Sequence, residues 1–162
     1  MKTLILMRHA KSSWKDNSLP DHQRPLNKRG KRDATRMGKF LKKQGNKLDV
    51  ILCSTAKRAV STVKYFIQEY NFEGEVFYLD DLYGTDIERY IAILNRLDND
   101  IDMAMIVGHN PEMDYFLEIV CDETEHMPTA SIAVIRLLID DWIELKEITP
   151  GELINLWKPG VI

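Results

Sequence analysis

Four side chains of this chain are of the types that bind and attack a phosphoryl group: Arg8, His9, Arg58 and His109. Arg8, His9 and His109 come just after apolar runs with the composition of buried strands, and Arg58 lies one helical turn beyond the end of another such run. Arginine forks bind phosphate oxygens, and a neutral imidazole can attack phosphorus to form a covalent phosphohistidine. In phosphoryl transfer, the arginines would neutralise the charge on the equatorial oxygens. The second histidine could donate hydrogen bonds to the same oxygens, so this chemistry needs no divalent metal.

Strands and helices are predicted to alternate around these four side chains. The apolar runs that fit buried strands are residues 3–7, 49–53, 75–79 and 102–107. Apolar residues at helical spacing predict helices over residues 28–44 and 55–70, and capping patterns predict helix starts at Thr85 and Asn110. This alternation predicts βαβ units and a mostly parallel sheet. Ligands of such sheets bind at the carboxyl ends of the strands, so we expect the four side chains to converge on one pocket.

The last part of the chain has a different pattern. Residues 131–140 and 142–148 are two apolar stretches on either side of the Asp140-Asp141 pair, which predicts an antiparallel hairpin at a sheet edge. The length of 162 residues predicts one domain, over residues 1–162. We therefore expect an α/β fold: a three-layer α/β/α sandwich with a mostly parallel sheet and an antiparallel edge strand.

The composition argues against several classes of protein. The net charge of −3 differs from that of a general nucleic-acid binder, which is normally basic. No apolar stretch reaches the roughly 18 residues that span a bilayer, and Arg8 interrupts the N-terminal run too early for a signal peptide. We therefore expect a soluble, cytoplasmic protein without a nucleic-acid or membrane partner. The two cysteines, Cys53 and Cys121, lie beside apolar runs, which predicts reduced, buried thiols.

Several polar residues permit two interpretations. Arg24 could close over a bound phosphate or only pack its loop, and Ser12 could contact phosphate or bind backbone in its turn. Residues 28–33, KRGKRD, fit a solvated helix face but could also steer an acidic protein substrate toward the site. His22 and His126 lie in stretches typical of loops, and we expect both at the surface.

A cysteine nucleophile is a weaker possibility. Residues 53–58, CSTAKR, place an arginine near Cys53, as in cysteine-dependent phosphatases. The spacing is one residue shorter than the five-residue loop of those enzymes, and the segment lacks glycines. Cys53 is also expected to point into the sheet. No His, Cys or carboxylate spacing resembles a zinc site, so we expect no metal and no cofactor.

The motifs around the four side chains resemble those of a known family. LMRHAKSSW, STAKRAVST and VGHNPEMD are similar to segments of the histidine phosphatase superfamily, which has the phosphoglycerate-mutase-like fold. With the short chain and the segment DHQRPLNKRGKRDA, they are most similar to SixA-type bacterial phosphohistidine phosphatases. The resemblance extends from Leu4 to about Ser131. It implies that His9 is the nucleophile and that Arg8, Arg58 and His109 form the phosphate pocket.

Three positions depart from the family pattern. Ala10 replaces the glycine of the common Arg-His-Gly opening, and Lys15 stands where relatives with mutase activity carry an asparagine. Many relatives have a glutamate as general acid shortly before a Phe-Gly or Tyr-Gly pair, and here Asp80 precedes Tyr83-Gly84. Asp80 could be the proton donor, or it could belong to a solvated turn. Without a strong acid, a phosphoramidate would suit the site better than an alkyl ester, because its imidazole nitrogen is readily protonated.

The resemblance implies a phosphatase that works in two steps through a covalent phosphohistidine. Its leading substrate would be phosphohistidine on a signalling or phosphotransfer protein. One alternative is a small-molecule phosphomonoesterase of the same mechanism, which would act on unactivated alkyl phosphates. Another is a catalytically weak module that binds phosphorylated partners without turning them over.

Overall fold

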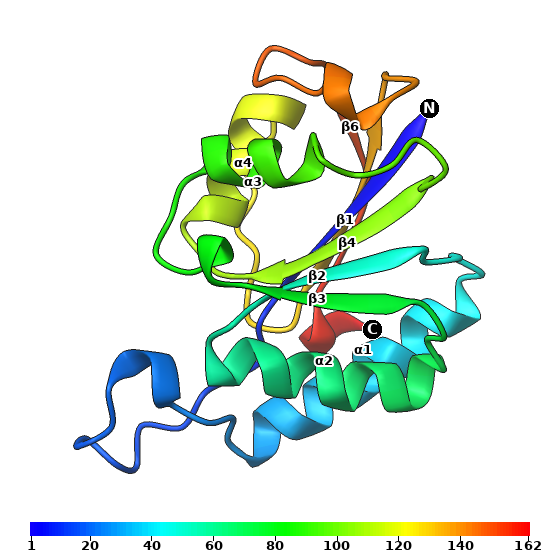
Figure 1. Cartoon of the computed structure of the whole chain (residues 1–162). Helices are drawn as coiled ribbons and strands as arrows, with labels where there is room; N and C mark the ends of the chain where they lie inside the picture. The colour runs from blue at the N-terminus through cyan, green and yellow to red at the C-terminus, as the bar shows by residue number, and fades with distance from the viewer.

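The computed structural model describes all 162 residues and contains one six-stranded sheet with the order β3-β2-β4-β1-β5-β6. The strands are β1 Lys2–Arg8, β2 Val50–Ser54, β3 Glu75–Leu79, β4 Met103–Gly108, β5 Ile132–Leu137 and β6 Gly151–Trp157. The α-helices are α1 Lys28–Lys43, α2 Lys57–Tyr70, α3 Ile87–Leu94 and α4 Glu112–Cys121. Figure 1 shows α1 and α2 on one face of the sheet and α3 and α4 on the other. The predicted three-layer α/β/α fold is confirmed.

The sheet has a parallel part and an antiparallel part. Strands β1, β4, β2 and β3 pair in parallel, whereas β5 runs antiparallel to both β1 and β6. At the carboxyl ends of the parallel strands, Arg8 of β1 lies beside Gly108 of β4, and Cys53 of β2 lies beside Val107. The segments that follow these three strands therefore leave the sheet at the same edge.

The central strands are buried on both faces because helices cover both sides of the sheet. Along β1, Leu4 and Leu6 belong to the core cluster that includes α3 and α4, whereas Ile5 and Met7 belong to the cluster that includes α1 and α2. Such strands appear in sequence as continuous apolar runs, which explains why they were predictable. The edge strand β3 differs, since its Phe77 keeps 44% of its surface exposed.

Helix α1 is positioned against the loop that follows β1. Asn27 caps the helix, and its side chain accepts a hydrogen bond from the Gly30 N–H at 2.8 Å. A Cβ atom at position 30 would overlap the carbonyl oxygen of Lys11, so glycine permits this close approach. After the helix, Gly45 adopts a φ of 77°, the left-handed conformation that commonly ends helices.

Two helices start slightly later than their capping patterns predict. Asp86 rather than Thr85 caps α3, because the Asp86 side chain accepts a hydrogen bond from the backbone N–H three residues on. Helix α4 has Pro111 rather than Asn110 at its N-cap position, although the Asn110 side chain accepts a hydrogen bond from the Asp114 N–H at 3.2 Å. None of the helices combines the length and the apolar character needed to cross a membrane.

The predicted C-terminal hairpin exists, but its second strand was placed wrongly. Residues 142–148 form a short 3₁₀ helix and a loop, and the strand that pairs with β5 is β6. The aromatic ring of Trp142 is fully buried, and its Nε1 donates a hydrogen bond to the Ile101 carbonyl oxygen at 2.7 Å. Trp142 and Leu145 of this segment are thus used for the core rather than for a strand, whereas Ile143 and Ile148 are exposed.

Candidate active site

The carboxyl edge of the parallel strands carries a polar cavity of about 320 Å³. Arg8 and His9 reach it from the end of β1. Arg58 comes from the first turn of α2, and His109 from the turn after β4. The structure thus brings the four predicted side chains together. The other lining residues are Lys11, Ser12, Trp14, Asp21, Arg24, Asn110 and Thr129.

His9 is held in one orientation with one ring nitrogen free. Its Nδ1 lies 2.8 Å from the carbonyl oxygen of Ala10, so Nδ1 carries the proton and donates it. The Ala10 N–H in turn donates to Thr62 Oγ1 at 2.9 Å, which fixes this turn of the chain. Burial lowers the pKa of His9 to about 3, so the imidazole is neutral at pH 7. The lone pair of Nε2 is therefore available to attack an electrophile.

His109 presents a free N–H group close to His9. His109 Nε2 lies 2.8 Å from Ser54 Oγ, whose hydroxyl can donate to it while accepting a hydrogen bond from the Ala56 N–H at 3.2 Å. With Ser54 as the donor, the proton of the neutral imidazole is on His109 Nδ1, and this atom is buried without a partner. Burial, and next the nearby Arg58, lower the pKa of His109 to about 4. The rings of His9 and His109 lie 5.1 Å apart, centroid to centroid.

Arg8 contributes a second donor without a partner. Its Nη1 donates to the carbonyl oxygen of Met127 at 3.0 Å, but its Nε is buried with no hydrogen bond. The molecule has three such buried side-chain atoms, and the third is Glu112 Oε2. Each unpartnered buried group costs about 1–3 kcal/mol, so two of them in one cavity indicate a site built for an acceptor.

Arg58 is already paired, with an acid that the sequence analysis missed. Its Nη2 donates to Asp21 Oδ2 at 3.0 Å, and its Nη1 donates to the Asp21 carbonyl oxygen at 2.8 Å. The hydroxyl of Tyr83 also donates to Asp21 Oδ2, at 2.7 Å. Tyr83 and then Arg58 lower the pKa of Asp21. A cation in the first turn of a helix opposes the helix dipole, and the Asp21 carboxylate offsets this conflict.

Arg24 and Ser12, for which the sequence permits two interpretations, both line the cavity. Arg24 is buried, and its Nη2 donates to Ser12 Oγ at 2.7 Å. Its guanidinium also lies over the ring of Trp14, 3.1 Å from the centroid, and its Nη1 donates to Asp21 Oδ1 at 3.1 Å. The loop thus holds a third arginine at the cavity. Direct contact of Arg24 or Ser12 with phosphate stays a prediction.

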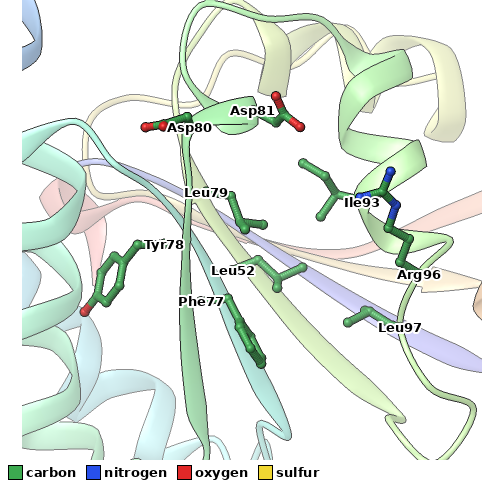
Figure 2. A pocket seen from close by; sticks show the side chains of 9 residues that line it. All are labelled: Leu52, Phe77, Tyr78, Leu79, Asp80, Asp81, Ile93, Arg96 and Leu97. Carbon is green, nitrogen blue, oxygen red and sulfur yellow. The ribbon is translucent and has the colours of Figure 1, made fainter.

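Asp80 lies outside the polar cavity. It lines a neighbouring, mostly apolar cavity of about 430 Å³ between β3 and α3 (Figure 2). In Figure 2 its carboxylate points away from that of Asp81 and from the apolar side chains. It accepts a hydrogen bond from Thr55 Oγ1 at 2.6 Å, and Thr55 Oγ1 lies 3.0 Å from His22 Nε2. A role for Asp80 as proton donor therefore stays a prediction.

The structure also shows the exposure of the other two histidines and of Cys53. His126 is exposed, as expected, but His22 is half-buried, with its ring edge-on to Tyr83. This difference arises because the 3₁₀ helix that contains His22 packs against the start of α2. Cys53 is fully buried outside the polar cavity, and burial raises the pKa of its thiol, which argues against a cysteine nucleophile. No group of three or more His, Cys, Asp or Glu side chains is arranged to hold a metal ion.

Comparison with known proteins identifies relatives of this chain. Residues 4–93, more than half of the chain, match the model of the histidine phosphatase superfamily (branch 1). An uncharacterized protein of Mycobacterium tuberculosis is 32% identical over 142 residues, which cover 81% of this chain and 87% of that protein.

Solved structures of SixA proteins are also similar to this chain. A candidate phosphohistidine phosphatase SixA from Nakamurella multipartitia has a TM-score of 0.84 at 29% identity, covering 98% of this chain and 96% of the other. The protein histidine phosphatase SixA in complex with tungstate has a TM-score of 0.83 at 25% identity, covering 98% and 97%. The resemblance found in the motifs is thus confirmed. By sequence and by structure, the chain belongs to the histidine phosphatase superfamily.

Proposed function

We propose that this chain is a metal-independent phosphohistidine phosphatase in which residues 1–162 act as one histidine phosphatase domain. Nε2 of His9 attacks the phosphorus, and a new N–P bond forms as the bond from phosphorus to the leaving nitrogen breaks. The leaving imidazole takes up a proton from solvent. Water then attacks the phosphorylated His9 and loses a proton, which releases inorganic phosphate and restores the neutral imidazole.

The observation that carries this proposal is the pair of buried, unpartnered donors beside the neutral His9. Phosphoryl oxygens would accept hydrogen bonds from Arg8 Nε and His109 Nδ1, the two groups that lack a partner. Arg58, at the positive end of the α2 dipole, would stabilise the remaining charge. Because these groups neutralise the oxygens themselves, the proposed reaction does not require a metal ion.

The similar structures support a phosphate-like oxyanion as the ligand. Tungstate, which is bound in one SixA structure, is a tetrahedral oxyanion like phosphate. The SixA protein from Nakamurella multipartitia is a candidate phosphohistidine phosphatase, which supports a phosphorylated histidine as the substrate.

The protonation state of the one carboxylic acid at the cavity favours a nitrogen leaving group over an alkoxide leaving group. Asp21 is the only carboxylic acid that lines the cavity, and its hydrogen bonds with Tyr83 and Arg58 lower its pKa. It is therefore ionised at neutral pH and is a poor proton donor. An imidazole leaving group accepts a proton readily from water, whereas an alkoxide needs a general acid that contributes about 10²–10⁴-fold.

The test compares phosphate release from a phosphotransfer domain that carries phosphohistidine with release from a phosphoserine peptide. We expect preferential release from phosphohistidine by the wild type and by His126→Ala, a control that removes an exposed imidazole. His9→Ala should lose this activity. Mass spectrometry of the quenched wild-type reaction should find phosphate on His9.

Each other outcome assigns a different function. Equal or faster release of phosphate from the ester would leave the proposed mechanism unchanged but would indicate that the substrates are small phosphomonoesters. Binding of phosphate without turnover would identify a module that only recognises phosphorylated partners. Activity that survives His9→Ala would refute His9 as the nucleophile.

A further inference from the structure

Helix α1 carries a surface on which every exposed charge is positive. Its exposed charged residues are Lys28, Arg29, Lys31, Arg32, Arg36, Lys39, Lys42 and Lys43, which together we call the α1 basic face. The one acid of the helix, Asp33, is buried and lies 3.5 Å from Arg29 Nε. The chain as a whole has a net charge of −3, so this face departs from the overall composition.

Most of these cations make no ion pair and no side-chain hydrogen bond within the protein. Arg29 pairs with Asp33, and Arg36 donates a hydrogen bond to the carbonyl oxygen of Ile162. Arg32 and Lys39, by contrast, make no ion pair and no side-chain hydrogen bond. Like charges four residues apart on a helix are destabilising by about 0.2–0.5 kcal/mol per pair. A row of unpaired cations therefore costs stability unless an anionic partner compensates it.

The α1 basic face starts next to the candidate active site. The Asn27 N–H donates to the Lys11 carbonyl oxygen at 3.0 Å, and Lys11 lines the polar cavity. In Figure 1, α1 continues from the blue loop that leaves the carboxyl end of β1. A partner that lies along α1 can therefore present a phosphorylated side chain at the cavity.

On the opposite side of the sheet, exposed acids predominate around the end of β3 and the start of α3. Asp80, Asp81, Asp86 and Glu88 are exposed there, and the exposed Arg89 lies 3.8 Å from Asp81. This separation of charge orients an approaching acidic protein so that it meets α1, and it disfavours a long polyanion that would touch several faces.

We propose that the α1 basic face is the docking surface for an acidic protein that carries the phosphohistidine substrate. This inference rests on the proposed function and adds the partner to it. The interaction is electrostatic, so it accelerates encounter with a protein substrate and leaves the chemistry at His9 unchanged. A small substrate has no acidic surface to meet α1, and it reaches the cavity without help from this face.

The test compares two substrates and two matched double variants. The substrates are a phosphotransfer domain of net negative charge that carries phosphohistidine, and free phosphohistidine. Arg32→Glu/Lys39→Glu reverses two unpaired cations of the α1 basic face. Arg96→Glu/Lys146→Glu makes the same change in charge outside α1, at two exposed positions. Thermal melting verifies folding, and Arg32→Gln/Lys39→Gln replaces the reversal variant if that one unfolds.

At an ionic strength of about 50 mM, we expect the α1 variant to lose about 10-fold or more in kcat/KM for the protein substrate. Its kcat/KM for free phosphohistidine should equal that of the wild type, and the control variant should match the wild type on both substrates. For the wild type, kcat/KM for the protein should also fall more steeply with salt than kcat/KM for free phosphohistidine.

The contrary results are distinct. An equal loss on both substrates, or no loss on either, would overturn the docking surface while the phosphatase activity stands. A wild type that hydrolyses neither substrate would refute the proposed function itself. Binding to phosphatidylserine vesicles or to duplex DNA that depends on Arg32 and Lys39, with unchanged kcat/KM for the protein substrate, would overturn the proposal in favour of that partner.

Discussion

The polar cavity and the apolar cavity differ in the residues that line them more than in their size. The polar cavity measures about 320 Å³, and arginines, histidines and other polar groups line most of it. The apolar cavity measures about 430 Å³ and includes Leu52, Phe77, Leu79, Ile93 and Leu97 (Figure 2). Two residues that line the polar cavity, Arg8 and His109, each have a buried side-chain nitrogen without a partner, whereas no residue that lines the apolar cavity has one. The larger cavity is therefore the poorer candidate for phosphate chemistry.

The position of each cavity relative to the strands explains this difference. The polar cavity lies at the carboxyl ends of the parallel strands, where loops and the first turn of α2 leave the sheet. The apolar cavity lies on a face of the sheet beside the edge strand β3, which has a neighbour on only one side. Strand ends gather polar groups from several segments, whereas an incompletely covered sheet face exposes core side chains.

The strongest test of the comparison exchanges one arginine in each cavity. Arg58→Ala should reduce kcat/KM for phosphohistidine by about 10²–10³-fold, because it removes charge that stabilises the transition state. Arg96→Ala, in the apolar cavity, is the matched control and should retain wild-type activity. Steady-state kinetics with free phosphohistidine measures both. Similar losses in the two variants would abolish the distinction between the cavities.

The dependence of stability on pH is the next largest effect. The pKa values of His9 and His109 fall from 6.5 to about 3 and about 4, so the unfolded chain binds more protons than the folded one below about pH 6.5. Their contribution to stability is complete above pH 6.5 and declines as the pH falls toward 4. Each buried imidazole should contribute up to about 1.4 kcal/mol per pH unit to this decline.

Urea unfolding between neutral and acidic pH measures this effect. His9→Ala and His109→Ala should each show a shallower decline of the unfolding free energy than the wild type. His126→Ala, which removes an exposed imidazole, should keep the wild-type slope. Identical slopes in all four proteins would contradict the buried, neutral state of the two site histidines.

A smaller effect is expected for Asp21, the acid that forms an ion pair with Arg58. Asp21→Asn keeps the shape of the side chain but removes a negative charge beside the phosphate position. Because like charges disfavour a bound dianion, tungstate should bind the variant about 3–10-fold more tightly. Calorimetry measures this binding, with Asp81→Asn at the apolar cavity as the control. Weaker binding by Asp21→Asn would instead show that this acid mainly positions Arg58.

The smallest effect is expected for Asp80, which lines the apolar cavity and accepts a hydrogen bond from Thr55. Asp80→Asn should change phosphate release from phosphohistidine and from a phosphoserine peptide by less than about 3-fold, because a true general acid contributes about 10²–10⁴-fold. Phe77→Ser, in the apolar cavity, is the control for a substitution that removes no acid or base. A loss of about 100-fold on the ester alone would identify Asp80 as the proton donor and extend the active site toward the apolar cavity.

Local patterns in the sequence were sufficient for much of the fold and for the central side chains. The strands β1, β2 and β4 were predictable because a strand covered on both faces is a continuous apolar run, and the edge strand β3 was predictable because its sequence is also mostly apolar, although it is not buried. The site residues Arg8 and His9 stood out because they end such a run. The strand β6 was missed because its residues are mostly half-buried or exposed and form no such run. Asp21 was missed because its partner Tyr83 lies 62 residues away along the chain.

Residue patterns along the chain indicated which residue types end each strand, how strands and helices alternate, and which helix carries the positive charge. The folded structure was needed to show that Nε2 of His9 is free, that Arg58 is paired with Asp21, and that Asp80 lines another cavity. Burial and hydrogen bonds depend on which distant segments the strand order brings together. Those contacts set the tautomers and pKa values of the site, and no local pattern of residues encodes them.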